Sequence, residues 1–230
     1  MTPGRIEIKI CGLATPETAV LCATAGADAI GLVFHAPSPR NVTPERAAEI
    51  AAAVPAHVAR VGVFAAQDAA AILAIAATAG LTAVQLHGPC AALPAAPFLA
   101  AGLRPVYVLC AAGDELVRQA RTVPAEAGVL VECGRGVLPG GNGAAWAWSE
   151  AAALAGVRPF AIAGGLDAAS VAAAVAVSGA TAVDVSSGVE SAPGRKDPAR
   201  IRAFIAAARA AGDARRPAPA GQAVFRGGPA

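Results

Sequence analysis

The chain of 230 residues has little aromatic and little charged character: Phe, Trp and Tyr make up 4% of it, and Asp, Glu, Lys and Arg 15%. Its five cysteines are an odd number, and none of them forms a CxxC pair. This usage does not fit a disulfide framework, and it predicts free thiols in a reducing compartment. The first residues, MTPGRIEIKICG, also lack the apolar stretch of a secretory signal. We therefore expect a cytoplasmic protein.

The sequence also lacks a large excess of charge of one sign and lacks long apolar runs. Eighteen Lys and Arg residues stand against sixteen Asp and Glu, and they form no basic stripe of the kind that binds nucleic acid. The longest membrane-like run, residues 69–84, is short for a span, rich in alanine and interrupted at Gly80. These absences predict a protein that binds neither nucleic acid nor a membrane.

What the sequence does have is an alternation of short apolar runs with alanine-rich segments. Apolar residues make up 56% of the chain, which argues against disorder over most of its length. Thr15-Pro16-Glu17 and Thr43-Pro44-Glu45 are typical helix starts, each with a hydroxyl cap, a proline and an early acid. Eight runs predict strands: Ile6–Ile10, Ala29–Phe34, Ala59–Phe64, Ala83–Leu86, Pro105–Leu109, Gly128–Val131, Pro159–Ala163 and Ala182–Val185.

Eight strands that alternate with seven or eight helices indicate an α/β fold, the closed (β/α)8 TIM barrel, rather than an open doubly wound sheet. The open sheet usually has a glycine-rich turn after its first strand, whereas this first strand ends in Cys11-Gly12. We expect a single domain over residues 1–211. Residues 212–230 lack periodicity and are broken by prolines and glycine pairs, so we predict a disordered tail there.

Side chains along a barrel strand alternate between the interior and the surrounding helices. The outward positions must be apolar, so polar residues in each strand should share the inward parity. Those near the carboxyl ends of their strands should meet at the mouth, where barrel enzymes carry their active sites. The predicted inward polar side chains are Glu7, Lys9, Cys11, Gln85, His87, Glu132, Asp184 and Ser186.

Single members of this set also have simpler interpretations. Cys11 could be a small apolar filler, His87 a structural hydrogen-bonding group, and Lys9 the partner of an inward carboxylate. A zinc site of Cys11, His87 and Glu132 is conceivable, but Lys9 would repel the ion and no ligand spacing supports it, so we predict no metal. Together, a thiol, an imidazole, a carboxyl and an ammonium group at one mouth favour a catalytic site.

Two glycine-containing loops indicate a site for a phosphorylated small molecule. The seventh strand is followed by Gly164-Gly165, and the eighth by Ser186-Ser187-Gly188. Loops at these two places, with backbone N–H groups freed by glycine, form the usual phosphate site of such barrels. Arg40, in the loop after the second strand, could meet a second anionic group. Gly140-Gly141-Asn142-Gly143 is a third glycine cluster, which could form a flap or a backbone contact.

These residues occur in motifs that resemble one known family. Lys9-Ile10-Cys11-Gly12, Gln85-Leu86-His87-Gly88, Gly164-Gly165-Leu166 and above all Val183–Glu190, followed by Pro193–Asp197, are similar to phosphoribosylanthranilate isomerase of tryptophan biosynthesis. The resemblance runs in order over residues 6–208. It implies a (β/α)8 barrel and a cofactor-independent aldose–ketose isomerase. Such an enzyme converts N-(5'-phosphoribosyl)anthranilate into 1-(o-carboxyphenylamino)-1-deoxyribulose 5-phosphate by an Amadori rearrangement.

The resemblance also implies roles for individual residues. Cys11 would be the general base that removes the C2 proton of a ring-opened Schiff base, helped by Lys9, which would lower the pKa of the thiol. Glu132 stands where the family has its general acid, an aspartate. Arg40 would hold the anthranilate carboxylate, and Asp184 would lie near its amine. The expected substrate-binding residues are Lys9, Arg40, Gln85, His87 and Asp184, and the expected phosphate-binding residues are Gly164, Gly165, Ser186, Ser187 and Gly188.

The departures from the family pattern all follow the sixth strand: Glu132 replaces the aspartate, Asn142 interrupts the glycine segment, and Ala147 precedes Trp148. One alternative is therefore a diverged paralogue that binds a phosphorylated ligand with altered or no catalysis. Another is an aldolase-like lyase with a Schiff base at Lys9. The bifunctional histidine–tryptophan isomerases are disfavoured, because they have an aspartate at the place of Cys11. We expect a monomer or a homodimer.

Overall fold

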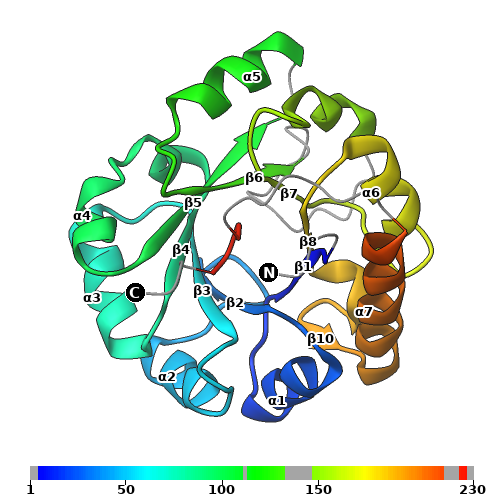
Figure 1. Ribbon diagram of the computed structural model, residues 1–230. Coiled ribbons are helices and arrows are strands. Elements are labelled where there is room, and N and C mark those ends of the chain that lie inside the picture. Colours follow the sequence, from blue (N-terminus) through cyan, green and yellow to red (C-terminus); the bar gives the residue numbers. More distant parts are fainter. Residues whose placement is uncertain (1–4, 111–112, 133–146, 215–222, 227–230) are drawn as a thin grey trace.

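The computed structural model describes residues 5–110, 113–132, 147–214 and 223–226. Eight parallel strands follow one another in chain order around a closed barrel, and β8 pairs back onto β1 (Figure 1). The predicted (β/α)8 barrel is therefore confirmed, and the open sheet is excluded. The strands are β1 (Glu7–Cys11), β2 (Ala29–Phe34), β3 (Ala59–Phe64), β4 (Ala83–Leu86), β5 (Arg104–Cys110), β6 (Gly128–Glu132), β7 (Ala161–Ile162) and β8 (Ala182–Val185).

Helices surround the barrel, and in the part of the chain described none combines the length and apolar character needed to cross a bilayer. The α-helices are α1 (Pro16–Ala25), α2 (Pro44–Ala52), α3 (Ala69–Ala79), α4 (Ala96–Ala100), α5 (Gly113–Thr122), α6 (Val171–Ser178) and α7 (Pro198–Asp213). Short 3-10 helices and a hairpin occupy connecting segments: η1 (Gly88–Ala92), η2 (Trp148–Leu154), η3 (Ser187–Val189), β9 (Glu190–Ala192) and β10 (Arg195–Lys196).

Side-chain caps start several of these helices, and the sequence predicts those at Thr15 and Thr43. Thr15, Thr43, Asp68 and Asp197 each accept a hydrogen bond from a backbone N–H in the first turn of the helix that follows. Each cap satisfies a donor that has no partner within the helix. The caps therefore fix where the helices begin, and with them the loops at the carboxyl ends of the strands.

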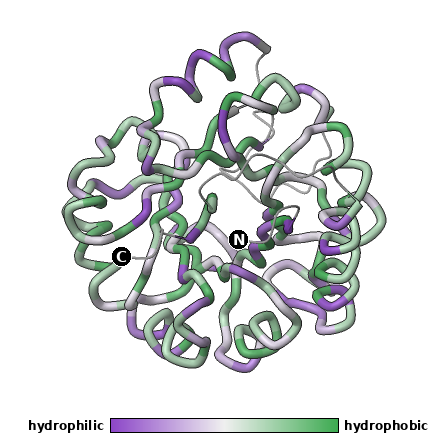
Figure 2. Tube along the Cα trace, in the orientation of Figure 1, coloured by the Kyte–Doolittle hydropathy of each residue, from purple (hydrophilic) through white to green (hydrophobic). Residues whose placement is uncertain are grey.

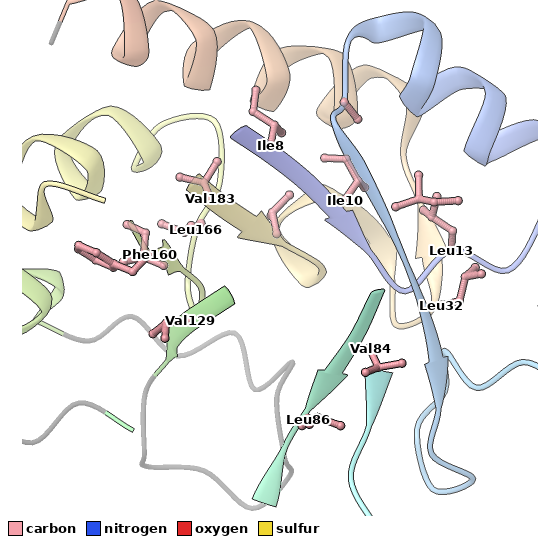
Figure 3. Packing of buried hydrophobic residues seen from close by; sticks show 14 of the residues in the cluster. Ile8, Ile10, Leu13, Leu32, Val84, Leu86, Val129, Phe160, Leu166 and Val183 are labelled. Atoms are coloured by element: carbon pink, nitrogen blue, oxygen red, sulfur yellow. The ribbon is translucent and has the colours of Figure 1, made fainter. Parts of the chain in front are cut away.

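Strand side chains divide between the outside and the inside of the barrel with the predicted alternation. Ile8, Ile10 and Val183 are fully buried in the large cluster between strands and helices (Figure 3). Lys9, between the two isoleucines, is fully buried on the inner side. Figure 2 shows apolar residues along the barrel strands and hydrophilic residues recurring along the outer helix α5.

Small side chains line much of the barrel interior. Alanine is too short to fill the centre of an eight-stranded barrel, which larger side chains normally occupy. Phe225, from the C-terminal segment, belongs to the same interior cluster and is fully buried there, so its ring supplies part of the missing volume. The alanines come from five strands: Ala29, Ala59, Ala83, Ala161 and Ala182.

The structure corrects part of the prediction for residues 212–230. Helix α7 continues to Asp213, and Val224 and Phe225 are 2% and 0% exposed rather than disordered. The prediction failed at these residues because local periodicity carries no information about burial against strands that are distant in the sequence. Residues 215–222 and 227–230 of the predicted tail lie outside the described residues.

Candidate active site

A cavity opens at the carboxyl ends of the barrel strands. Lys9 lies beneath this cavity, towards the amino-terminal end of the barrel. Gly188 packs against the loop after β7, where a Cβ on it would come within 1.9 Å of the Leu166 carbonyl oxygen. The other predicted site residues all line the cavity: Cys11, Arg40, Gln85, His87, Glu132, Gly164, Gly165, Asp184, Ser186 and Ser187.

Cys11 ends β1 at the cavity, and Lys9 lies two residues below it on the same inner face. Gly31 of β2, the register partner of Cys11, makes room for both side chains. A Cβ on Gly31 would lie 2.7 Å from Cys11 Sγ and 3.1 Å from Lys9 Nζ, so the thiol and the ammonium border the same small space. Gly31 is not among the predicted site residues, although a glycine inside a strand often marks such a close approach.

Burial raises the pKa of the Cys11 thiol, and Lys9 offsets only part of this rise. The prediction that Lys9 lowers this pKa is correct for the effect of Lys9 itself. The net shift is in the opposite direction, because taking the thiol out of water disfavours its charged form. The protonated thiol is therefore the resting form near neutral pH, and the thiolate depends on the charges beside it.

Lys9 and Asp184 form a buried ion pair beneath the cavity. Lys9 Nζ lies 3.0 Å from each carboxylate oxygen of Asp184. Burial alone would lower the pKa of Lys9, but Asp184 and Cys11 outweigh that effect and raise it. Lys9 thus remains an ammonium ion rather than a nucleophilic amine, which argues against the Schiff-base lyase. Asp184, expected near the substrate amine, is engaged by Lys9 at the floor of the cavity.

His87, directly after β4, lies between Gln85 and Glu132. Gln85 Nε2 lies 2.6 Å from His87 Nε2, and His87 Nδ1 lies 4.0 Å from Glu132 Oε1. Burial, with the charge of Lys9 nearby, lowers the pKa of His87 to about 3. The imidazole is therefore neutral, and when Gln85 donates to Nε2 the ring proton sits on Nδ1, on the side of Glu132. His87 can orient the carboxyl group, but it cannot supply a proton as an imidazolium at neutral pH.

Arg40 is held in the wall of the cavity by a second ion-pair network. Its Nε and Nη2 donate to the two carboxylate oxygens of Glu190, each at 2.8 Å. Lys196 Nζ donates to Glu190 Oε1 at 2.7 Å and to the Ser186 carbonyl oxygen at 3.0 Å. Nη1 of Arg40 makes no hydrogen bond within the described part of the chain, which leaves it available to an anionic ligand. Gly12 permits this arrangement, since a Cβ on it would lie 2.5 Å from Arg40 Cδ.

Glu190 and Lys196 are site residues to which the sequence analysis gave no role. Both stand in the segment that carries the most specific family motif, so a signal was present. The motif could not reveal their partners, because the hairpin of β9 and β10 brings Lys196 back onto Glu190 and Ser186 only in the folded chain.

The two predicted phosphate loops lie side by side at the cavity. Gly164 and Gly165 have φ values of 87° and 68°, a left-handed conformation that favours glycine. The Ser186 hydroxyl donates to the carbonyl oxygen of Cys11 at 3.1 Å, which ties the loop after β8 to the end of β1. Trp148 Nε1 donates to the Gly164 carbonyl oxygen at 3.1 Å and fixes the other loop.

Residues 133–146, which follow Glu132, lie outside the described residues, and with them the predicted Gly140–Gly143 loop and Cys133. Within the residues that are described, no group of three His, Cys, Asp or Glu side chains is arranged to hold a metal ion.

A closed barrel with a thiol, a carboxyl and an imidazole at the carboxyl-end mouth defines a TIM-barrel enzyme of acid–base chemistry. Residues 8–207 match the profile of one family, described as N-(5'phosphoribosyl)anthranilate (PRA) isomerase. The chain belongs to this family, as the resemblance of its motifs predicted.

Individual relatives agree with this assignment. A protein from Paramagnetospirillum magneticum named N-(5'-phosphoribosyl)anthranilate isomerase is 43% identical over 214 residues, covering 89% of this chain and 97% of that protein. The crystal structure of phosphoribosyl anthranilate isomerase from Thermotoga maritima is 33% identical, with a TM-score of 0.79 over 89% of this chain and 99% of that one. A crystal structure of such an isomerase in complex with reduced 1-(o-carboxyphenylamino)-1-deoxyribulose 5-phosphate is 32% identical, with a TM-score of 0.76 and the same coverage.

Proposed function

We propose that the chain catalyses the Amadori rearrangement of N-(5'-phosphoribosyl)anthranilate to 1-(o-carboxyphenylamino)-1-deoxyribulose 5-phosphate in tryptophan biosynthesis, without a cofactor. One observation carries the assignment of the catalytic groups: Cys11 from β1 and Glu132 from β6 line a single cavity. A thiol and a carboxyl at one cavity can serve as the base and the acid for one sugar. The related isomerase crystallised with the reduced product supports this choice of ligand.

Glu132 is the general acid in this mechanism. Its proton passes to the furanose ring oxygen as the bond between that oxygen and C1 breaks, which gives an open-chain Schiff base. His87 faces Glu132 and stays neutral, because burial lowers its pKa to about 3. The neutral ring orients the carboxyl group without competing as a proton donor.

Cys11 is the general base. Its thiolate takes the proton from C2, the electrons of that C–H bond form a C1–C2 double bond, and the Schiff-base nitrogen receives the displaced pair. The resulting enolamine tautomerises to the ketone. Lys9 supports this step because its ammonium charge borders the thiol and opposes the effect of burial on the pKa of Cys11.

The remaining predicted residues anchor the two ends of the substrate. Arg40 would bind the anthranilate carboxylate through Nη1, since Glu190 already holds Nε and Nη2. The loops with Gly164-Gly165 and Ser186-Ser187 would bind the phosphate with backbone N–H groups. The ammonium of Lys196, bonded to Ser186, adds positive charge behind the second loop.

The test is turnover of freshly generated N-(5'-phosphoribosyl)anthranilate, followed by the loss of its fluorescence. Cys11→Ala and Glu132→Gln should each abolish turnover and retain binding of the reduced product, because neither change touches the phosphate loops. Cys22→Ala is the matched control, since Cys22 is buried on α1 away from the cavity. Binding of the reduced product by the unmodified protein without any turnover would instead support the non-catalytic paralogue.

We also propose a cytoplasmic location and a monomeric or homodimeric state. Cys11, Cys22 and Cys90 are unpaired, which suits a reducing compartment. The related isomerase from Thermotoga maritima is described as dimeric. Sedimentation velocity on the purified chain would distinguish the two states.

A further inference from the structure

Residues 224–226, here called the C-terminal plug, enter the amino-terminal end of the barrel (red in Figure 1). The carboxylate of Glu7 accepts hydrogen bonds from the backbone N–H groups of Val224 at 2.6 Å, Phe225 at 3.2 Å and Arg226 at 3.2 Å. The plug lies beyond residues 8–207, the part matched by the family profile.

The strands are fitted to this plug. Arg104 Nε on β5 donates to the Val224 carbonyl oxygen at 2.9 Å. A Cβ on Gly128 of β6 would lie 2.3 Å from the same oxygen, so any side chain larger than that of glycine would clash with the plug here. Together with the interior alanines, these contacts form a seat for the plug inside the barrel.

Phe225 lies directly against the ion pair beneath the catalytic cavity. Its ring centroid is 5.5 Å from Lys9 Nζ, and both side chains are fully buried. The backbone of Phe225 is bound to Glu7, two residues before Lys9 on β1, whereas Cys11 is two residues after it. The ring and the thiol therefore lie on opposite sides of the ammonium group, which also attracts the face of the ring.

We propose that Phe225 is a positioning residue for the isomerase: its ring keeps water from the lower side of Lys9 and so holds the ammonium against Asp184 and Cys11. The inference rests on the proposed function for the role of Cys11 as base. Without the ring, water would hydrate Nζ on the side away from the thiol, so the thiol would stay buried while its attraction to the ammonium group weakens, since charges interact more weakly at higher dielectric. The charged or titratable groups that act on Lys9 or Cys11 are Asp184, His87, Arg40 and Lys196. Glu7 and Arg226 form an ion pair at the plug. The plug substitutions below change none of these groups.

The experiment compares Phe225→Ala and Phe225→Leu in the full chain. The rate of alkylation of Cys11 by iodoacetamide is followed against pH by peptide mass spectrometry, and kcat and KM are measured over the same pH range. For Phe225→Ala both the alkylation midpoint and the kcat/KM midpoint should move up by about one pH unit, which is about tenfold less thiolate below the midpoint. KM should change little, because the phosphate loops are intact. Phe225→Leu, which excludes water but has no ring face, should move both midpoints by a smaller amount.

Val224→Ala is the matched control, because it removes apolar volume from the same plug without changing the ring below Lys9. It should lower stability and leave both midpoints unchanged. Unchanged alkylation and kcat/KM midpoints in Phe225→Ala and Phe225→Leu would overturn the proposal. If Phe225→Ala does not fold, the midpoints of Phe225→Leu alone test the proposal. A shift in the alkylation midpoint without a shift in the kcat/KM midpoint would support the effect of Phe225 on Lys9 and Cys11. It would at the same time refute the assignment of Cys11 as the base.

Discussion

Lys9 and Asp184 are register partners on β1 and β8, and their side chains meet inside the barrel with Nζ 3.0 Å from both carboxylate oxygens. The pair acts on the Cys11 thiol in opposite directions, because Lys9 lowers the pKa of the thiol while Asp184 raises it. Burial of the thiol and the balance between these two charges, rather than Lys9 alone, therefore determine how much thiolate the site contains.

The first prediction follows from this balance. Asp184→Asn removes the negative charge, while Cys11 still supports the ammonium of Lys9 against the effect of burial. The pKa of Cys11 should therefore fall by about one unit. The alkylation midpoint of Cys11, read by peptide mass spectrometry, should move to lower pH by that amount. The double variant Lys9→Met/Asp184→Asn removes both charges and is the control, which should lose this gain. A midpoint that stays in place in Asp184→Asn would show that the pair does not control the thiol.

Much of the barrel could be predicted from the sequence because its strands alternate strictly. The isoleucines of β1 fix the outward side, and this parity alone places Lys9 and Cys11 inside. The residues that line the cavity could also be predicted from the sequence, because the carboxyl ends of the parallel strands lie together at one mouth of the barrel.

What the sequence could not predict depends on burial and on distant partners. The net rise in the pKa of Cys11 comes from desolvation, which no residue pattern reports. Phe225 stands in a segment rich in glycine and proline, and its burial depends on alanines contributed by separate strands. The pairing of Arg40 with Glu190 joins residues 150 positions apart.

A second prediction concerns the carboxyl group at the end of β6. Glu132→Asp withdraws the carboxyl group by one methylene from the side of His87, whose Nδ1 is already 4.0 Å away. A displacement of this size should lower kcat by about 100-fold with little change in KM, because binding of the phosphate and the anthranilate is untouched. Steady-state kinetics on the fluorescent substrate give both constants. A higher kcat in Glu132→Asp would instead mark Glu132 as poorly placed for the acid role.

The third prediction concerns the ion pair of Glu190 with Arg40. Glu190→Gln removes the carboxylate that holds both Nε and Nη2, so Arg40 should lose its fixed direction towards the cavity. We expect KM to rise by about tenfold, the equivalent of one charged hydrogen bond, with a smaller effect on kcat. Glu49→Gln is the control, since it removes a carboxylate from an exposed pair with Arg46 and should leave both constants unchanged. If KM and kcat changed by the same factors in Glu190→Gln and in Glu49→Gln, a specific role for Glu190 would be refuted.

The last prediction concerns stability at acid pH and rests on His87. The unfolded chain takes up a proton at this histidine below about pH 6.5, whereas burial and Lys9 hold the pKa of the folded state at about 3. Between these values the unfolded state binds the additional proton, so the free energy of unfolding contributed by His87 falls as the pH falls.

The size of this effect can be measured by difference. At pH 5 the free energy of unfolding should be about 2 kcal/mol lower than at neutral pH, because pH 5 lies about 1.5 units below the pKa of His87 in the unfolded chain. Urea unfolding of the unmodified chain and of His87→Asn should give curves against pH that run parallel near neutrality and converge by that amount towards pH 5, since the variant has no proton to take up. His57→Asn is the control, because His57 is exposed and its curve should stay parallel to that of the unmodified chain throughout. If His87→Asn also stays parallel down to pH 5, the imidazole accepts its proton in the folded state, and Glu132 would then face an imidazolium rather than a neutral ring.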